Sequence, residues 1–201
     1  MLLAAVFVPL LHFFIARPLV YNGIRHYLFL VAPLIVLAGI GVDMAYAWVR
    51  SRGEMAARAF AAAFTVAAGV QVAIMVDLHP DEYIYYNAFA GGVAGAAGRY
   101  DLDYWGLSLA EATRKLEHVL AREKRKADGE PWRVYVCGDR MSAAYFFADG
   151  SNLRYTHDIA DADYGVAIRS GECGDLVKGP TLLQIERRGA ILSYVTDLRG
   201  P

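Results

Sequence analysis

Long uncharged apolar stretches near the start of the chain are the feature that most constrains its fold. Residues 27–42 contain no charged side chain, the apolar character resumes after Asp43 as far as Val49, and residues 59–76 are also uncharged. Both stretches approach the roughly 20 residues that a helix needs to cross a ~30 Å hydrocarbon core. The sequence therefore predicts membrane-spanning helices at about 27–49 and 59–76, in preference to buried core helices of a soluble protein.

A third apolar stretch, residues 1–16, is shorter and contains Pro9 and His12. At ~1.5 Å per residue, a helix of this length reaches only about 24 Å. A signal peptide would have a basic segment and a small-residue cleavage site, whereas no Lys or Arg precedes Arg17. We interpret the stretch as a spanning helix whose beginning is missing, so that the chain is expected to be the tail of a longer protein.

The composition divides the chain into a membrane part and a water-facing part. The chain is 56% hydrophobic with a mean hydropathy of +0.28, but all lysines and most carboxylates lie beyond residue 76. The net charge of −1 predicts no nucleic-acid partner, because nucleic-acid binding usually requires a basic patch. The fold class predicted is membrane α-helical, with about three transmembrane helices in residues 1–76, followed by a junction at 77–106 and a small extracytoplasmic α/β domain at 107–201.

The charges of the loops predict the orientation in the membrane. The loop 50–58 carries three arginines, whereas residues 77–82 carry three carboxylates. The positive-inside rule then puts 50–58 in the cytoplasm and everything after Val76 outside. The short loop 17–26 must also face outward, although it contains Arg17 and Arg25.

The helix predicted to open the water-facing domain begins with a capping box at Ser108 and Glu111. Its apolar stripe consists of Leu109, Ala112, Leu116 and Val119, and the charged run 122–131 ends it.

Beyond this helix the pattern predicts one short helix and several strands. Asp139 is placed to cap the short helix, which ends near Gly150, and Gly189 lies in the turn of a predicted hairpin. The predicted strands are 132–138, 153–157, 164–169, 181–186 and 191–196.

Cys137 and Cys173 are the only cysteines. In an extracytoplasmic domain they can form one disulfide; two unpaired thiols are the alternative. Their spacing fits no zinc site. Oxygen ligands that a hard cation prefers occur around His79, but they match no known loop, so we predict no metal site. The side chains that could in principle gather such a cation are those of His79, Asp81, Glu82, Asp101 and Asp103.

The junction is unusually rich in aromatic residues. Because amphipathic rings favour the headgroup region, this tract is expected to lie along the outer membrane boundary. The interleaved carboxylates and asparagine need a further explanation. The rings are Tyr83, Tyr85, Tyr86, Phe89, Tyr100, Tyr104 and Trp105.

The loop 17–26 carries basic side chains, which complement the carboxylates of the junction. Arg25 and His26 lie where the second apolar helix begins, and a cation there is disfavoured by the helix dipole unless it has an anionic partner. Lipid headgroups are one such partner, and a bound lipid phosphate held by the guanidinium fork is the other.

Three segments carry a resemblance to a known family. "YNGIRHYLFLVAPLIVLAGIG", "LHPDEYIYYNAFAGG" and "GRYDLDYWGLS" together resemble the C-terminal part of bacterial family 39-type membrane glycosyltransferases. These belong to the GT-C class and are related to protein O-mannosyltransferases. The resemblance covers residues 17–110, while residues 111–201 resemble the variable tails of such proteins only loosely.

This resemblance implies many spanning helices in the bacterial cytoplasmic membrane, a polyprenyl-phosphate-linked sugar donor, and transfer on the outer face. It also implies an acidic residue in the first outer loop of the full-length enzyme, which activates the acceptor or coordinates a divalent metal. No segment of this chain corresponds to that loop, so no catalytic residue and no cofactor can be carried over.

The expected site residues form two groups. Binding of the donor lipid phosphate is expected at Tyr21, Arg25 and His26. Contacts with the sugar, the acceptor or the interface are expected at His79, Tyr86, Asn87, Asp101, Asp103, Tyr104 and Trp105.

Two functions follow. The chain is the C-terminal portion of a polyprenyl-phosphate-sugar-dependent glycosyltransferase, inactive alone and partnered by membrane lipid, the lipid-linked sugar and a separate N-terminal catalytic membrane subunit. The alternative is a non-catalytic, membrane-anchored extracytoplasmic binding or scaffold protein.

Overall fold

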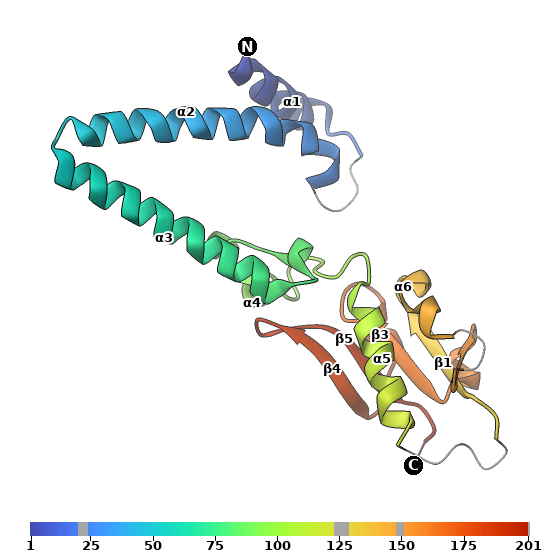
Figure 1. Ribbon diagram of the computed structural model, residues 1–201. Helices are drawn as coiled ribbons and strands as arrows, with labels where there is room; N and C mark the ends of the chain where they lie inside the picture. Colours follow the sequence, from blue (N-terminus) through green and yellow to red (C-terminus); the bar gives the residue numbers. More distant parts are fainter. Residues whose placement is uncertain (20–23, 123–128, 148–150, 201) are drawn as a thin grey trace. The chain divides into compact units, whose positions relative to one another are not determined.

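Apolar helices form the first of two units into which the chain divides, residues 1–74 and 75–201. We name them the helical unit and the α/β unit. The computed structural model describes residues 1–19, 24–122, 129–147 and 151–200, and Figure 1 shows their elements.

The helical unit consists of α1 (Leu2–Ala16), the 3₁₀ helix η1 (Ile24–Leu30), α2 (Val31–Arg50) and the greater part of α3 (Glu54–Leu78). Two continuous helices, Arg25–Arg50 and Glu54–Leu78, are apolar and long enough to cross a membrane, with 26 and 25 residues. This confirms the prediction of apolar helices at these two places. The third, α1, is helical but has only 15 residues, fewer than the roughly 20 that a span requires.

Few side chains of the helical unit are buried within it. None of those in α2 is buried, and the exposed ones include Ile35, Met44 and Trp48. Local contacts hold the helices at their ends: the rings of Phe13 and Tyr27 meet edge to face at 5.5 Å. So much exposed apolar surface is typical of a membrane or protein interaction site.

The α/β unit is built on a five-stranded mixed sheet in the order β2-β1-β3-β5-β4. β1 pairs in parallel with β2 and β3, and β5 pairs antiparallel with β3 and β4. The strands are β1 (Trp132–Cys137), β2 (Leu153–Thr156), β3 (Tyr164–Ile168), β4 (Thr181–Arg187) and β5 (Ala190–Asp197). All five lie where the sequence predicts strands, and β4 and β5 form the predicted hairpin.

Helix α5 (Ser108–Leu120) lies against one face of the sheet (Figure 1) and contacts β3, β4 and β5. Leu109, Ala112 and Leu116 are fully buried there, as the apolar stripe predicts. Val119 is exposed, and Leu120 is buried in its place. The prediction that Val119 ends the buried stripe is therefore wrong. Leu120 can replace it because residues four apart, such as Leu116 and Leu120, also lie on the same face of a helix.

The other face of the sheet carries a smaller apolar cluster beneath the short helix α7 (Cys173–Leu176). Because side chains alternate along a strand, Tyr194 belongs to this second cluster, while its neighbour Val195 packs on the α5 side. The helix α6 (Arg140–Ala144) follows β1, and Asp139 caps it as predicted by accepting from Met141 N at 3.0 Å. Gly150 lies outside the described residues.

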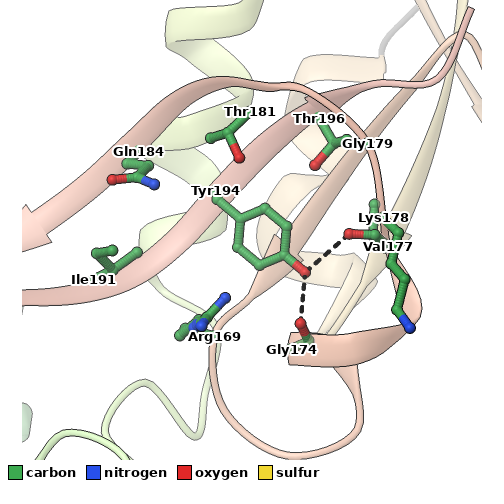
Figure 2. Close-up of a pocket in the computed structure, with 10 residues that line it drawn as sticks. All are labelled: Arg169, Gly174, Val177, Lys178, Gly179, Thr181, Gln184, Ile191, Tyr194 and Thr196. Carbon is green, nitrogen blue, oxygen red and sulfur yellow. Dashed lines mark hydrogen bonds between the residues drawn. The ribbon is translucent and has the colours of Figure 1, made fainter. Parts of the chain in front are cut away.

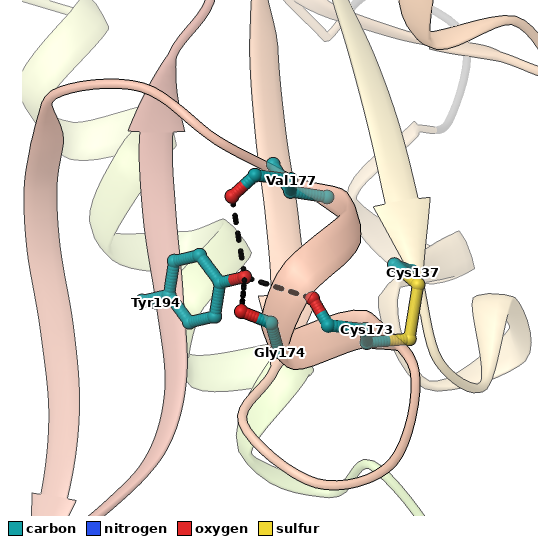
Figure 3. The surroundings of a disulfide bond; sticks show 5 residues. All are labelled: Cys137, Cys173, Gly174, Val177 and Tyr194. Atoms are coloured by element: carbon teal, nitrogen blue, oxygen red, sulfur yellow. Dashed lines mark hydrogen bonds between the residues drawn. A yellow bond between two sulfur atoms is a disulfide. The ribbon is translucent and has the colours of Figure 1, made fainter.

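A disulfide joins Cys137 at the end of β1 to Cys173 at the start of α7 (Figure 3). Of the two alternatives that the sequence leaves open, the structure therefore shows the bonded pair. The bond closes a loop with a sequence separation of 36 and ties α7 to the end of β1.

We predict that replacing both cysteines by serine destabilises the α/β unit by about 4 kcal/mol, because the bond no longer restricts the unfolded chain. Urea unfolding of the full chain in detergent, followed by near-UV circular dichroism, measures this loss. Reductant should destabilise the parent and leave the double variant unchanged; equal effects on both would contradict a disulfide.

Candidate functional site

The junction between α3 and α5 is an irregular segment with three short helices. These are η2 (Glu82–Ile84), η3 (Ala88–Ala90) and α4 (Gly92–Ala96). Ile84, Val93 and Leu102 are buried, so the segment is packed as part of the α/β unit.

Asp103 is the buried centre of this segment, with no exposed surface. Its carboxylate accepts from Leu107 N at 2.9 Å and Ser108 N at 3.2 Å. The hydroxyls of Ser108 and Tyr83 also donate to it. Asp103 therefore caps the N-terminus of α5, where the first N–H groups have no partner within the helix.

The predicted capping box at Ser108 and Glu111 is consequently wrong. Ser108 is the first residue of α5 rather than its cap, and its hydroxyl donates to Asp103. Glu111 instead faces Arg187 and Lys115. A carboxylate accepts stronger hydrogen bonds than a serine hydroxyl, which explains why Asp103 takes the capping role.

A second buried carboxylate, Asp81, belongs to an ion-pair network. Arg187 Nε lies 2.9 Å from Asp81 Oδ2, and Arg187 Nη2 lies 2.5 Å from Glu111 Oε2. Lys115 Nζ completes the network at 2.8 Å from Glu111 Oε1. One guanidinium thus links the junction, β4 and α5.

The pKa values of these groups reflect their surroundings. Burial raises the pKa of the Asp81 carboxyl, and Arg187 opposes that shift. Burial also acts to raise the pKa of Glu111, but hydrogen bonds from Lys115 and Arg187 outweigh it and hold that pKa below its usual value. Burial, followed by the contact with Asp103, raises the pKa of Tyr83 far above its usual value, so Tyr83 stays a neutral donor.

Two pairs of aromatic rings form the more exposed part of the junction. The rings of Tyr86 and Tyr100 stack at 5.3 Å with an interplanar angle of 17°. Those of Tyr104 and Trp105 meet edge to face at 5.3 Å. We name these four residues the junction aromatics. Trp105 is 56% exposed, and the backbone oxygen of Asp101 accepts from the Tyr86 hydroxyl at 3.4 Å.

Two further predicted site residues serve local structure. His79 Nδ1 lies 2.6 Å from Glu82 Oε1, and this contact holds the pKa of Glu82 below its usual value. Asn87 caps η3, since its side-chain oxygen accepts from Ala90 N at 3.2 Å.

The residues predicted to bind the lipid phosphate belong to the helical unit. Arg25 and His26 are neighbours in η1, and both are exposed. Tyr21 lies outside the described residues. The structure therefore brings Tyr86 and Asp101 together, keeps Tyr104 beside Trp105, and buries the carboxylate of Asp103.

The glycines of the junction allow close packing. Gly106 has φ +64°, and a Cβ there would lie 2.9 Å from Leu109 Cδ1. A Cβ on Gly95 would lie 2.6 Å from Ala90 O. Both positions lack the room that a side chain needs.

Sequence reasoning missed Arg187 and Glu111 as members of one ion-pair network, and Tyr83 as a donor to Asp103. Arg187 looks like an ordinary charge beside a hairpin turn, and its contact with Glu111 spans 76 residues. Only an expectation that a buried carboxylate needs a charged partner points to such a contact, and burial of Asp81 is not visible in the sequence.

The comparisons with known proteins add no relative. No protein-family model matches the chain, and neither a curated protein nor a solved structure matches it. Among the described residues, no group of three metal-ligating side chains is arranged to hold an ion.

We predict that Asp103→Ala destabilises the α/β unit by about 2–3 kcal/mol, because several buried donors lose a charged acceptor. Asp103→Asn should cost less, since it keeps one acceptor oxygen. The matched control Asp101→Ala removes an exposed carboxylate two residues away and should change stability by no more than about 0.5 kcal/mol. Urea unfolding of the full chain checks all three; equal losses at both positions would contradict the capping role.

Proposed function

We propose that this chain is the membrane-anchored, lipid-phosphate- and sugar-binding portion of a GT-C type glycosyltransferase that uses a polyprenyl-phosphate-linked sugar. The observation that carries the proposal is an exposed arginine, Arg25, at the start of a membrane-length apolar helix. The family resemblance of residues 17–110 supplies the donor class. In this proposal the chain binds and a separate segment or subunit catalyses.

Membrane anchoring is supported by Arg25–Arg50 and Glu54–Leu78, whose lengths match a hydrocarbon core of ~30 Å. In the proposal α1 is part of a third span of the bacterial cytoplasmic membrane. The α/β unit lies on the extracytoplasmic side, an arrangement that the disulfide favours because such bonds persist in oxidising compartments.

Arg25 is proposed to bind the phosphate of the lipid donor, with His26 beside it. A cation at a helix start is disfavoured by up to about 1 kcal/mol. A charge-assisted hydrogen bond to a phosphate contributes about 1.5–3 kcal/mol, which outweighs that cost. The planar guanidinium can also contact two phosphate oxygens at once.

The junction aromatics are proposed to bind the sugar or the acceptor. Their partly exposed rings offer flat apolar faces, and Asp101 adds polar groups beside Tyr86. His79 and Asn87 are proposed as part of the surface that borders them. Asp103 is not in this set, because it is fully buried.

A second candidate is a non-catalytic extracytoplasmic binding or scaffold module. The two buried carboxylates favour it, since Asp103 caps α5 and Asp81 pairs with Arg187. Carboxylates with these structural partners are poorly placed for general acid or base catalysis, which requires reach to the substrate.

We predict that Arg25→Ala lowers the affinity for a polyprenyl phosphate about tenfold or more, because about 1.4 kcal/mol corresponds to one decade. Arg25→Lys should fall between parent and alanine variant, since it keeps the charge but not the fork. Native mass spectrometry of the chain in nanodiscs with added polyprenyl phosphate measures the affinity.

Arg50→Ala is the matched control, because it removes the arginine at the other end of the continuous helix Arg25–Arg50, and it should leave the affinity unchanged. Phosphatidylglycerol in the same assay distinguishes a general headgroup contact from a donor site. If Arg25→Ala binds the polyprenyl phosphate as the parent does, the donor-site proposal fails and the scaffold candidate remains.

The proposed orientation predicts that reporters fused after residue 76 or at residue 201 are extracytoplasmic, and that a reporter inserted within 50–58 is cytoplasmic. The physical reason is the cluster of three arginines in that loop. Compartment-specific alkaline phosphatase and green fluorescent protein fusions provide the measurement. Cytoplasmic fluorescence from the fusion at residue 201 would contradict the orientation.

A further inference from the structure

A polar cavity of about 250 Å³ lies on the face of the sheet that α5 does not cover (Figure 2). It is lined by strands β4 and β5 and by the segment around α7. The residues that the argument uses are Arg169, Lys178, Thr181, Gln184, Tyr194 and Thr196. None of them belongs to the junction aromatics or to the helical unit.

The register of the hairpin explains why these side chains share a face. Thr181 of β4 pairs with Thr196 of β5, and Gln184 pairs with Tyr194. Paired residues project from the same side of a sheet. Figure 2 shows the Thr181 and Thr196 hydroxyls and the Arg169 side chain arranged around the ring of Tyr194.

Tyr194 forms a rigid part of the cavity wall. Its hydroxyl donates to Cys173 O at 2.8 Å, and Gly174 O and Val177 O lie at 3.4 and 3.3 Å (Figures 2 and 3). The disulfide holds the same segment from its other side. The cavity wall is therefore fixed before any ligand binds, which lowers the entropic cost of binding.

Thr196 is the observation that points to a ligand. It lines the cavity and is only 1% exposed, yet its Oγ1 has no hydrogen-bond partner among the described residues. A buried hydroxyl without a partner lowers stability, and an oxygen-bearing ligand in the cavity would provide one.

The charges of the cavity select an anion. Arg169 and Lys178 line it, and the described lining contains no carboxylate. Burial raises the pKa of the Tyr194 hydroxyl, and Arg169 opposes that shift, so the guanidinium acts directly on the cavity wall. Asp175 also influences Tyr194 but is not among the lining residues.

We propose that this cavity binds a small hydroxylated anion, either a sugar phosphate or a sugar acid. Arg169 holds the anionic group, with Lys178 at the rim. Thr196, Thr181 and Gln184 hydrogen-bond to the hydroxyls. The site is independent of the lipid-phosphate proposal, because it lies wholly within the α/β unit and uses none of the same residues.

Isothermal titration calorimetry of the full chain in detergent tests the site with glucose 1-phosphate and glucuronate as probes. At least one should bind the parent. Arg169→Gln should weaken that binding about tenfold or more, since it removes a charged contact. Thr196→Val keeps the shape and removes the hydroxyl, so it should weaken binding about fivefold while raising the melting temperature of the ligand-free chain.

Two control variants locate the binding. Arg154→Gln removes an exposed arginine on β2 and should leave the affinity unchanged. Trp105→Ala removes a junction aromatic and tests whether the probes bind at the junction instead. A loss with Trp105→Ala but not with Arg169→Gln would assign the ligand to the junction and overturn the cavity proposal.

Glucose and inorganic phosphate are the chemical controls, and both should bind at least tenfold more weakly than the better probe. Equal binding of glucose would overturn the requirement for an anion. If inorganic phosphate binds as tightly as the better probe, the cavity holds an adventitious ion only, and the proposal of a hydroxylated anion is overturned. If neither charged sugar binds the parent, the proposal is wrong, whatever the outcome for Arg25 and the polyprenyl phosphate.

Discussion

The capping of α5 by Asp103 is the interaction on which the α/β unit depends most. The carboxylate is fully buried and collects donors from Leu107, Ser108 and Tyr83. It therefore fixes both the start of α5 and the path of the junction that precedes it. A buried carboxylate is tolerated only because these donors satisfy it. Removing any of them therefore weakens the contacts that fix the start of α5 and the path of the junction.

The same arrangement limits what the junction can do. Asp81 is also buried, and Arg187 connects it to Glu111 on α5. These carboxylates hold the junction against the hairpin and the helix, and the junction aromatics stay at least partly exposed. Stacked and paired rings are suited to binding, and this is why the proposal assigns recognition rather than catalysis to this chain.

The two faces of the sheet have different roles. The face under α5 is filled by the larger apolar core. The opposite face has a smaller core, held by the disulfide and by the contacts of Tyr194 with the α7 segment. Because no long helix in the described part of the chain covers that face, polar side chains of β4 and β5 remain around a cavity. The cavity thus results from incomplete coverage of the sheet.

The sequence by itself determined the features that depend on local patterns. Uncharged apolar runs predict the two long helices, alternation predicts the five strands, and Gly189 predicts the hairpin turn. Only the tertiary structure decided the cap of α5, the disulfide and the partners of Arg187. The capping-box prediction failed because a carboxylate that follows an irregular loop outcompetes the local serine. Thr196 and Arg169 could not be recognised as cavity residues, because strand pairing and α7 bring them together and no local pattern records that contact.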